Sequence, residues 1–240
     1  MEMILQVLEL TSIFSEHIKN AGIIRYVNKE NAQQQEFVGN WLGYDYPLAC
    51  RVLKETDAPL LYPVMKRSAY RLSGFIGWAK YAPGWDINTV QKFVRDHVNS
   101  PAPRFHLIFT IGYEVVGFGS LAPMKKPRDI QVALWVAEGH EGRGIGSWIV
   151  TVLEWYAFNV FGYDNVFYQH DIGNSKSGNL AKRNGFKFSH VFQEKKTAWK
   201  EIGFWVSYKK QRPKGMHPGA IDTGTLDNWV GITFPWKCLI

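Results

Sequence analysis

One short segment of this sequence carries glycines at a spacing suited to holding phosphate. The segment Gly139-His140-Glu141-Gly142-Arg143-Gly144-Ile145-Gly146 follows an apolar stretch and precedes a stretch with helical spacing. Glycines let a backbone approach a ligand closely, and the first N–H groups of a helix point outward at the positive end of its dipole. A segment of this kind forms a cradle for a pyrophosphate, although a tight strand-to-helix turn without a ligand has the same pattern.

Three kinds of phosphate-binding loop compete for this segment. A P-loop requires Lys followed by Ser or Thr after its last glycine, whereas Ile145 and Gly146 follow Gly144. A dinucleotide-binding G-x-G-x-x-G loop counted from Gly142 requires glycine where Ser147 stands. The remaining candidate is the coenzyme A pyrophosphate loop of acetyltransferases.

A second motif lies downstream. Asn174-Ser175-Lys176-Ser177 precedes Leu180-Ala181-Lys182-Arg183-Asn184-Gly185-Phe186. In this order, the two motifs resemble the GNAT superfamily of N-acetyltransferases, whose loop reads Gln/Arg-x-x-Gly-x-Gly/Ala. They are most similar to its branch that acetylates ribosomal-protein N-termini, with an Asn-x-x-Ser and a Gly-Phe signature. The resemblance covers roughly residues 49 to 210 and is sharp from 130 to 186, but Glu141 stands where the family has Gln or Arg.

The resemblance implies an acetyl-CoA-dependent N-acetyltransferase in which a neutral amine attacks the thioester directly. Backbone groups near Leu134 and Val136, with Asn174, would hold the pantetheine arm, and the loop would bind the pyrophosphate. Asn174 also suits a helix cap, and Arg143 a solvated loop position. The implied cofactor site comprises Leu134, Val136, Glu141, Gly142, Arg143, Gly144, Ile145, Gly146, Ser147 and Asn174.

The residues that would move protons are less sharply marked. Ser177 matches a family Ser that donates to the leaving thiolate, although a first-turn helix Ser has the same pattern. The usual family glutamate falls at Gln131, which cannot accept a proton at neutral pH. Asp129, two residues away on the same strand face, is the nearest carboxylate, unless it is a solvent-exposed Asp at the strand start. His170 and Asp171, at the end of the next strand, are further candidates for a relay. The predicted catalytic set is Asp129, Ser177 and His170.

The charge balance leaves a second function open. The net charge is +7, and the C-terminal part is rich in Lys and Arg interleaved with aromatic residues. This suits a nucleic-acid-binding or nucleobase-modifying protein of GNAT fold, whereas strand alternation explains the same aromatics as core. We prefer the enzyme, acting on a primary amine of a protein N-terminus or a small molecule.

The cysteine content, the N-terminal sequence and the lengths of the apolar runs indicate where in the cell the protein would act. Cys50 and Cys238 are the only cysteines, so the sequence predicts neither a disulfide framework nor a metal site. The N-terminus has no signal-peptide pattern, and no run of about eighteen apolar residues could span a membrane. These features favour a cytoplasmic protein without membrane contact.

The elements that position these residues follow from periodicity. Two helices come first. One is opened by Thr56 or Asp57 and has Pro59 in its first turn, and the other runs from Asn88 to Val98. We then expect a hairpin at 105–111 and 115–121, a strand at 130–136, a helix at 144–161, a strand at 166–170, a helix at 175–184, and strands at 186–192 and 202–208. This order predicts a mixed α/β (α+β) GNAT-like fold with a central, mostly antiparallel sheet flanked by helices. The expected divisions are an N-terminal extension at 1–47, the domain at 48–210 and a C-terminal tail at 211–240.

Overall fold

The computed structural model of the chain describes residues 25–28, 48–99, 105–197, 200–213 and 229–233. The chain divides into two units. The larger comprises residues 52–108 and 115–220, and the smaller comprises residues 1–51, 109–114 and 221–240.

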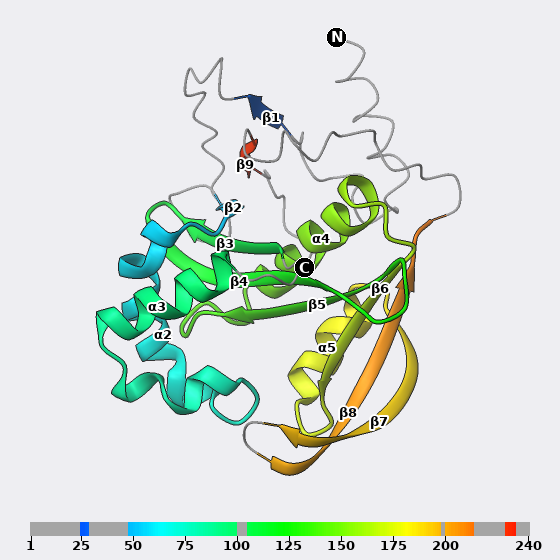
Figure 1. Cartoon of the computed structure of the whole chain (residues 1–240). Helices are drawn as coiled ribbons and strands as arrows, with labels where there is room; N and C mark the ends of the chain where they lie inside the picture. The colour runs from blue at the N-terminus through cyan, green and yellow to red at the C-terminus, as the bar shows by residue number, and fades with distance from the viewer. Residues whose placement is uncertain (1–24, 29–47, 100–104, 198–199, 214–228, 234–240) are drawn as a thin grey trace. The chain divides into compact units, whose positions relative to one another are not determined.

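The larger unit is built on strands in the order β3-β4-β5-β6-β8-β7, of which the end of β3 and the first residue of β4 are assigned to the smaller unit (Figure 1). β5 and β6 pair in parallel, whereas the pairs β4–β5, β6–β8 and β7–β8 are antiparallel. The mixed α/β GNAT-like fold expected from the sequence is confirmed. The strands are β3 (Phe105–Ile111), β4 (Glu114–Pro123), β5 (Asp129–Val136), β6 (Asn165–Asp171), β7 (Lys187–Thr197) and β8 (Lys200–Gln211).

The pairing between β5 and β6 is short. It runs from Asp129–Asn165 to Val132–Tyr168 and then stops. Beyond it, β5 continues beside β4 and β6 continues beside β8, so the two strands run apart (Figure 1). We call the break between residues 133–136 of β5 and 169–171 of β6 the β5–β6 gap. It interrupts the hydrogen-bond ladder in the middle of the sheet.

Two α-helices precede β3, and an acidic residue stands at the N-cap position of each. A 3-10 turn at Glu55–Asp57 leads into α2 (Ala58–Leu72), which has Pro59 in its first turn, as predicted. Asp57 stands at the N-cap position, but its carboxylate accepts the N–H of Lys54 at 2.8 Å and makes no cap hydrogen bond to α2. The second helix is α3 (Ile87–Val98), whose N-cap is Asp86; its carboxylate accepts the N–H of Thr89 at 2.8 Å. The predicted cap at Asn88 is therefore wrong by two residues.

The apolar faces of α2 and α3 form one core with the strands. The buried residues recur at helical spacing along α2 and α3, which places them on one side of each helix. They pack with Trp135 of β5 and with partly buried aromatic rings at Trp78, Trp85, Phe93 and Phe118. The buried members from the two helices are Ala58, Leu61, Val64, Met65, Leu72, Val90 and Val94.

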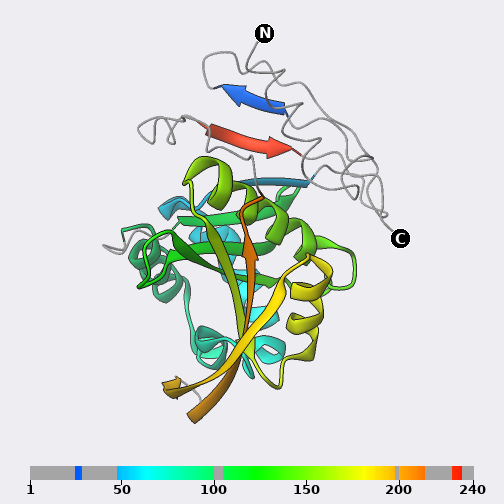
Figure 2. The same cartoon turned by 90° about the vertical axis from the view of Figure 1, so that its right-hand side faces the viewer.

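Two further helices, one before β6 in the chain and one after it, belong to the larger unit. α4 (Ile145–Trp155) follows β5 and ends in a π-helical turn, Tyr156–Val160; α5 (Ser175–Arg183) follows β6. Gly185, at φ 79°, lies just past the end of α5, as its predicted C′ role requires. β7 and β8 follow as a long paired ribbon (Figure 2).

In the smaller unit, β9 (Trp229–Thr233) pairs antiparallel with both β1 (Arg25–Asn28) and β2 (Leu48–Val52), whose last residue belongs to the larger unit. Apart from these strands and residues 211–213, the predicted extension and tail lie outside the described residues. None of the helices in the described ranges is both long enough and apolar enough to cross a bilayer.

Candidate active site

The glycine loop, residues 139–146, enters α4 through left-handed backbone conformations. Gly139, Gly142 and Gly144 have φ angles of 86°, 73° and 78°. A Cβ on Gly139 or Gly142 would meet no atom within 4 Å, so these glycines are required for conformation rather than for space. Gly144 is the N-cap of α4 and brings no capping side chain. The first N–H groups of α4 therefore have neither an intrahelical acceptor nor a side-chain cap.

The first turn of α4 lies against both β5 and α5. A Cβ on Gly146 would stand 3.1 Å from the Leu180 side chain and 3.7 Å from that of Val136. Ser147, one residue on, accepts a hydrogen bond from the Asn184 amide at 3.3 Å. A side chain at position 146 would be tight against Leu180 of α5 and in ordinary contact with Val136 of β5, so glycine allows this turn to approach α5 closely.

The backbone of β5 presents polar groups to the β5–β6 gap. Ala137 donates its N–H to Val116 of β4 at 2.8 Å. Because successive residues of an antiparallel strand face opposite sides, Val136 and Leu134 turn their N–H and C=O groups away from β4. They therefore point into the gap. The prediction that these two residues line the cofactor's path has this geometry in its favour.

Glu141 is held by a residue that the sequence reasoning missed. Its carboxylate pairs with Arg71 of α2 and also accepts the N–H of Gly139 at 2.9 Å. Arg71 donates in addition to the carbonyl of Val136 at 2.5 Å. A neighbouring α2 residue, Ser68, accepts the N–H of Glu138 at 3.0 Å. No sequence pattern joins α2 to a loop about 70 residues later, so these contacts could not be read from spacing.

The second motif forms the start of α5. Asn174 is its N-cap and accepts the N–H of Ser177 at 3.1 Å, so the cap interpretation of Asn174 is confirmed. The Ser177 hydroxyl lies 2.9 Å from that of Tyr168. Burial raises the pKa of Tyr168, against the opposing effect of the Ser177 hydrogen bond. Tyr168 is the last β6 residue paired with β5, so the residue that holds the Ser177 hydroxyl stands at the closed end of the gap.

His170 lies beside the same turn of α5. It is 6% exposed, and its Nδ1 lies 2.7 Å from the carbonyl of Asp171. A carbonyl only accepts, so Nδ1 carries the proton and Nε2 is the basic nitrogen of the neutral ring. Nε2 has no hydrogen-bond partner among the described residues, and a Cβ on Gly178 would stand 2.9 Å from it. Of the three predicted catalytic residues, the structure thus brings His170 and Ser177 to one turn of α5.

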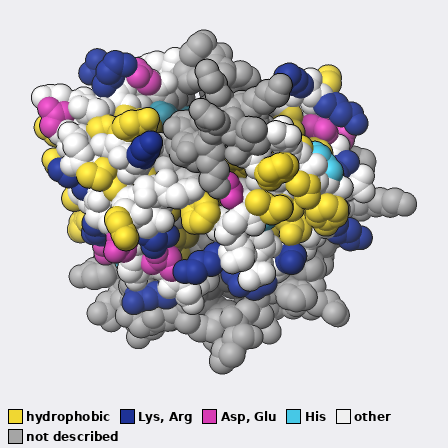
Figure 3. Space-filling view, turned by 90° about the horizontal axis from the view of Figure 1, so that it is seen from below, with side chains coloured by type: hydrophobic (Ala, Val, Ile, Leu, Met, Phe, Trp, Pro, Cys, Tyr) yellow, Lys and Arg dark blue, Asp and Glu magenta, His cyan; other side chains and the backbone are white. Residues whose placement is uncertain are grey.

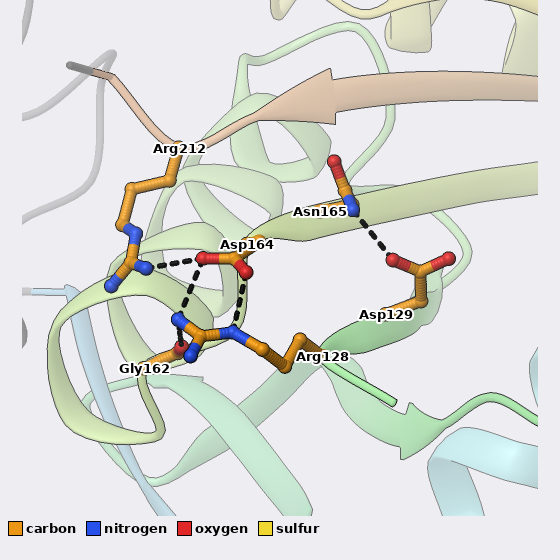
Figure 4. Close-up of polar contacts among 6 residues, drawn as sticks. All are labelled: Arg128, Asp129, Gly162, Asp164, Asn165 and Arg212. Carbon is orange, nitrogen blue, oxygen red and sulfur yellow. Dashed lines mark hydrogen bonds and ion pairs between the residues drawn. The ribbon is translucent and has the colours of Figure 1, made fainter. Parts of the chain in front are cut away.

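Asp129 has different surroundings (Figure 4). It is 5% exposed, and its Oδ1 accepts a hydrogen bond from the Asn165 amide at 2.6 Å. The alternative of a solvent-exposed Asp is therefore wrong. Asp129 and Asn165 form the first pair of the β5–β6 ladder, at the end away from the gap. Beside them, Asp164 pairs with Arg128 and Arg212, so this end of the strands is fastened together.

Comparisons with known proteins identify the family and the fold. Residues 48–187 match the family model described as an acetyltransferase (GNAT) domain. A comparison with curated proteins found no match.

Several solved structures share the fold. RimL, a ribosomal L7/L12 alpha-N-protein acetyltransferase solved with coenzyme A, has 16% identity and a TM-score of 0.62 over 69% of this chain and 94% of that one. MccE, a microcin C7 self-immunity acetyltransferase solved with acetyl-CoA and AMP, has 16% identity and a TM-score of 0.61 over 72% and 97%. A Salmonella typhimurium acetyltransferase that modifies the N-terminal serine of ribosomal protein L7/L12 has 17% identity and a TM-score of 0.60 over 70% and 96%.

Proposed function

Because the chain belongs to the GNAT acetyltransferase family, we propose that it moves the acetyl group of acetyl-CoA to a primary amine at the β5–β6 gap. The acceptor is either the N-terminal amine of a protein or the amine of a small molecule. The amine attacks directly, without an acetylated residue of the chain as an intermediate.

The β5–β6 gap is the observation that carries this proposal. Its β5 edge offers the N–H and C=O groups of Leu134 and the N–H of Val136 to the amides of a pantetheine arm, while the Val136 carbonyl already accepts a hydrogen bond from Arg71. The glycine loop and the first N–H groups of α4 follow directly and suit a pyrophosphate. The residues present thus fit the cofactor. Bound there, it supplies an acetyl thioester with a thiol leaving group.

Ser177 is suited to act on the leaving group. Its hydroxyl lies in the first turn of α5 and is hydrogen-bonded to Tyr168 at the closed end of the gap. A hydroxyl there can donate a hydrogen bond where negative charge develops on sulfur. Tyr168 is buried and its hydroxyl is hydrogen-bonded to that of Ser177, so we assign it a part that acts through Ser177.

The acceptor amine must lose a proton before or during attack. His170 carries its proton-free Nε2 against Gly178, the residue after Ser177, and it is the proton acceptor that we favour, although a small movement of this turn must first uncover the buried Nε2. Asp129 lies three residues before the end of the β5–β6 ladder and is engaged by Asn165. Asp129 could accept the amine proton only through a chain of water molecules.

The relatives support one of the two kinds of acceptor, a protein N-terminus. RimL and the Salmonella typhimurium protein act on ribosomal protein L7/L12, which supports a protein N-terminus. The nucleic-acid alternative has no support among these relatives. On the face shown in Figure 3, the Lys and Arg side chains of the described residues are scattered among acidic and apolar ones rather than gathered in one stripe.

The proposal is tested by release of free thiol from acetyl-CoA with a panel of acceptors. The panel contains peptides with free N-termini, the same peptides with blocked N-termini, and small primary amines. We expect thiol release only with free amines. Release that is independent of the acceptor would overturn the proposed transfer.

A glycine variant tests the site itself. Gly144→Val forces a side chain onto a left-handed residue at the start of α4, so acetyl-CoA affinity measured by calorimetry should fall at least tenfold. Gly84→Val is the matched control, because Gly84 has open space around it and no unusual φ. Unchanged affinity in Gly144→Val would rule out the loop as the cofactor site.

A further inference from the structure

We infer that Arg71 is a positioning residue for acetyl-CoA, whose guanidinium lets a loop with a glutamate at its centre hold a pyrophosphate. The inference rests on the proposed cofactor site. It adds a residue from the last turn of α2, outside both sequence motifs.

One guanidinium contacts two parts of the segment that would hold the cofactor. The Nη2 atom of Arg71 donates to the carbonyl of Val136, the last residue of β5, and Nε pairs with one carboxylate oxygen of Glu141. The other oxygen of Glu141 accepts the N–H of Gly139. Arg71 therefore joins the β5 edge of the gap to the middle of the loop, and both oxygens of Glu141 are engaged.

The charge of this group explains how Glu141 is tolerated. The loop of the family that this sequence resembles has Gln or Arg at this position, and a carboxylate there would repel a pyrophosphate with two negative charges. The positive charge of Arg71 cancels that of Glu141. Both side chains are about one third exposed, at 34% and 35%, so the pair can rearrange when an anion arrives.

A purely mechanical role for Arg71 makes a different prediction. If Arg71 only held α2 against β5, its loss would weaken every acetyl donor equally. If it balances charge, the loss depends on the phosphate groups of the donor. S-Acetylpantetheine carries the thioester and the pantetheine amides without a pyrophosphate, and it separates the two roles.

The experiment uses four variants of the full chain: Arg71→Gln, Arg71→Lys, Glu141→Gln, and Arg71→Gln combined with Glu141→Gln. Lys66→Gln is the matched control, because it removes the same charge from an exposed position on the same helix. Calorimetry gives the acetyl-CoA affinity, and kcat and KM are measured with acetyl-CoA and with S-acetylpantetheine.

We expect Arg71→Gln to weaken acetyl-CoA binding about tenfold, the effect of an uncancelled charge near two others in a partly solvated site. Its KM for S-acetylpantetheine should change less than about threefold. Adding Glu141→Gln should restore most of the affinity, and Arg71→Lys should keep it. Glu141→Gln alone should bind at least as tightly as the wild type.

Equal losses for both donors, or no recovery in the double variant, would reduce Arg71 to a mechanical contact. If Arg71→Gln does not fold, a Glu141→Gln variant that binds more weakly than the wild type overturns the inference. A wild-type chain that does not bind acetyl-CoA overturns the proposed function itself. Wild-type binding with an unaffected Arg71→Gln overturns this inference alone.

Discussion

Ser177 and Tyr168 come from different elements, α5 and β6, and their hydroxyls meet 2.9 Å apart. The Ser177 position could be predicted because it belongs to a motif with fixed spacing. Tyr168 could not, since an aromatic residue in an apolar strand reads as core, and only the packing of α5 onto β6 shows that its hydroxyl has a partner. The same holds for Arg71, whose contacts depend on where α2 ends relative to β5.

Ser177→Ala should lower kcat by about tenfold to a hundredfold and leave acetyl-CoA affinity unchanged, because the hydroxyl acts only as charge develops on the leaving sulfur. Tyr168→Phe keeps the buried ring and should cause a smaller loss. Ser175→Ala, at an exposed first-turn position of the same helix, is the control. Normal turnover in Ser177→Ala would remove Ser177 from the reaction.

Asp129→Asn tests the proton acceptor that the sequence favoured. The side chain is buried and accepts a hydrogen bond from the Asn165 amide. An Asn at 129 would either place its NH₂ group opposite the NH₂ group of Asn165 or require one of the two amides to rotate by half a turn. We expect the free energy of unfolding to fall by about 1–2 kcal/mol and kcat to change less than tenfold. Denaturant titration and thiol release measure the two effects. A stable variant with a hundredfold lower kcat would instead make Asp129 the base.

At the scale of elements, periodicity predicted most of the larger unit. The strands flanking the glycine loop, and both helices after it, lie within a few residues of their expected ends. The misses have local causes. Asp86 rather than Asn88 caps α3, since both residue types suit a cap and the helix begins at Ile87. The end of α4 takes a π-helical turn at Tyr156–Val160, which has no distinct apolar period.

One ion pair between elements was also invisible in the sequence. Glu154 of α4 is 3% exposed, and its carboxylate accepts a hydrogen bond from Lys210 of β8 at 2.7 Å. Lys210 also donates to the carbonyl of Asn184. Burial raises the pKa of Glu154 to about 7 in spite of the lysine. The helix stripe predicted for α4 contained apolar residues only, so nothing marked position 154 as buried.

The raised pKa of Glu154 gives a signed pH dependence. Because its value in the folded chain exceeds the unfolded value of 4.5, the folded state holds this proton more tightly. Its contribution to stability is complete below pH 4.5 and is lost as pH rises through about 7, by up to about 3 kcal/mol. Glu154→Gln should therefore lose less stability than the wild type between pH 5 and 7.5 in denaturant titrations. Exposed Glu138→Gln is the control, and parallel curves for the wild type and Glu154→Gln would contradict the assignment.

At the scale of the whole molecule, the N-terminal extension and the C-terminal tail match no motif of the family, and their aromatic residues predict a part in acceptor binding. The smaller unit holds β1, β2 and β9, and the tail sequence contains Trp229 and Trp236. The expected division at residues 47 and 210 stays a prediction. These segments lack a recognisable motif, so we propose that they serve the acceptor, the part of the reaction that varies within an enzyme family.

A chain ending at Arg212 keeps β3 to β8 and should bind acetyl-CoA with unchanged affinity. We expect its transfer to the best acceptor to fall at least tenfold, through a higher acceptor KM. Calorimetry and thiol release measure the two properties. Full transfer by the shortened chain would exclude the tail from the acceptor site.

The β5–β6 gap should be visible as a pattern in the amide hydrogen-exchange rates along β5. Ala137 donates its N–H to β4, whereas Leu134 and Val136 turn theirs into the gap, so exchange along this half of β5 should alternate between slow and fast from one residue to the next. In the paired half, Ile130 and Val132 lie between two neighbouring strands and should both exchange slowly. Saturating acetyl-CoA should protect the fast amides and leave Ala137 unchanged. The alternation would then disappear on binding, and the isotope pattern would map the position of the pantetheine arm before any complex has been crystallised.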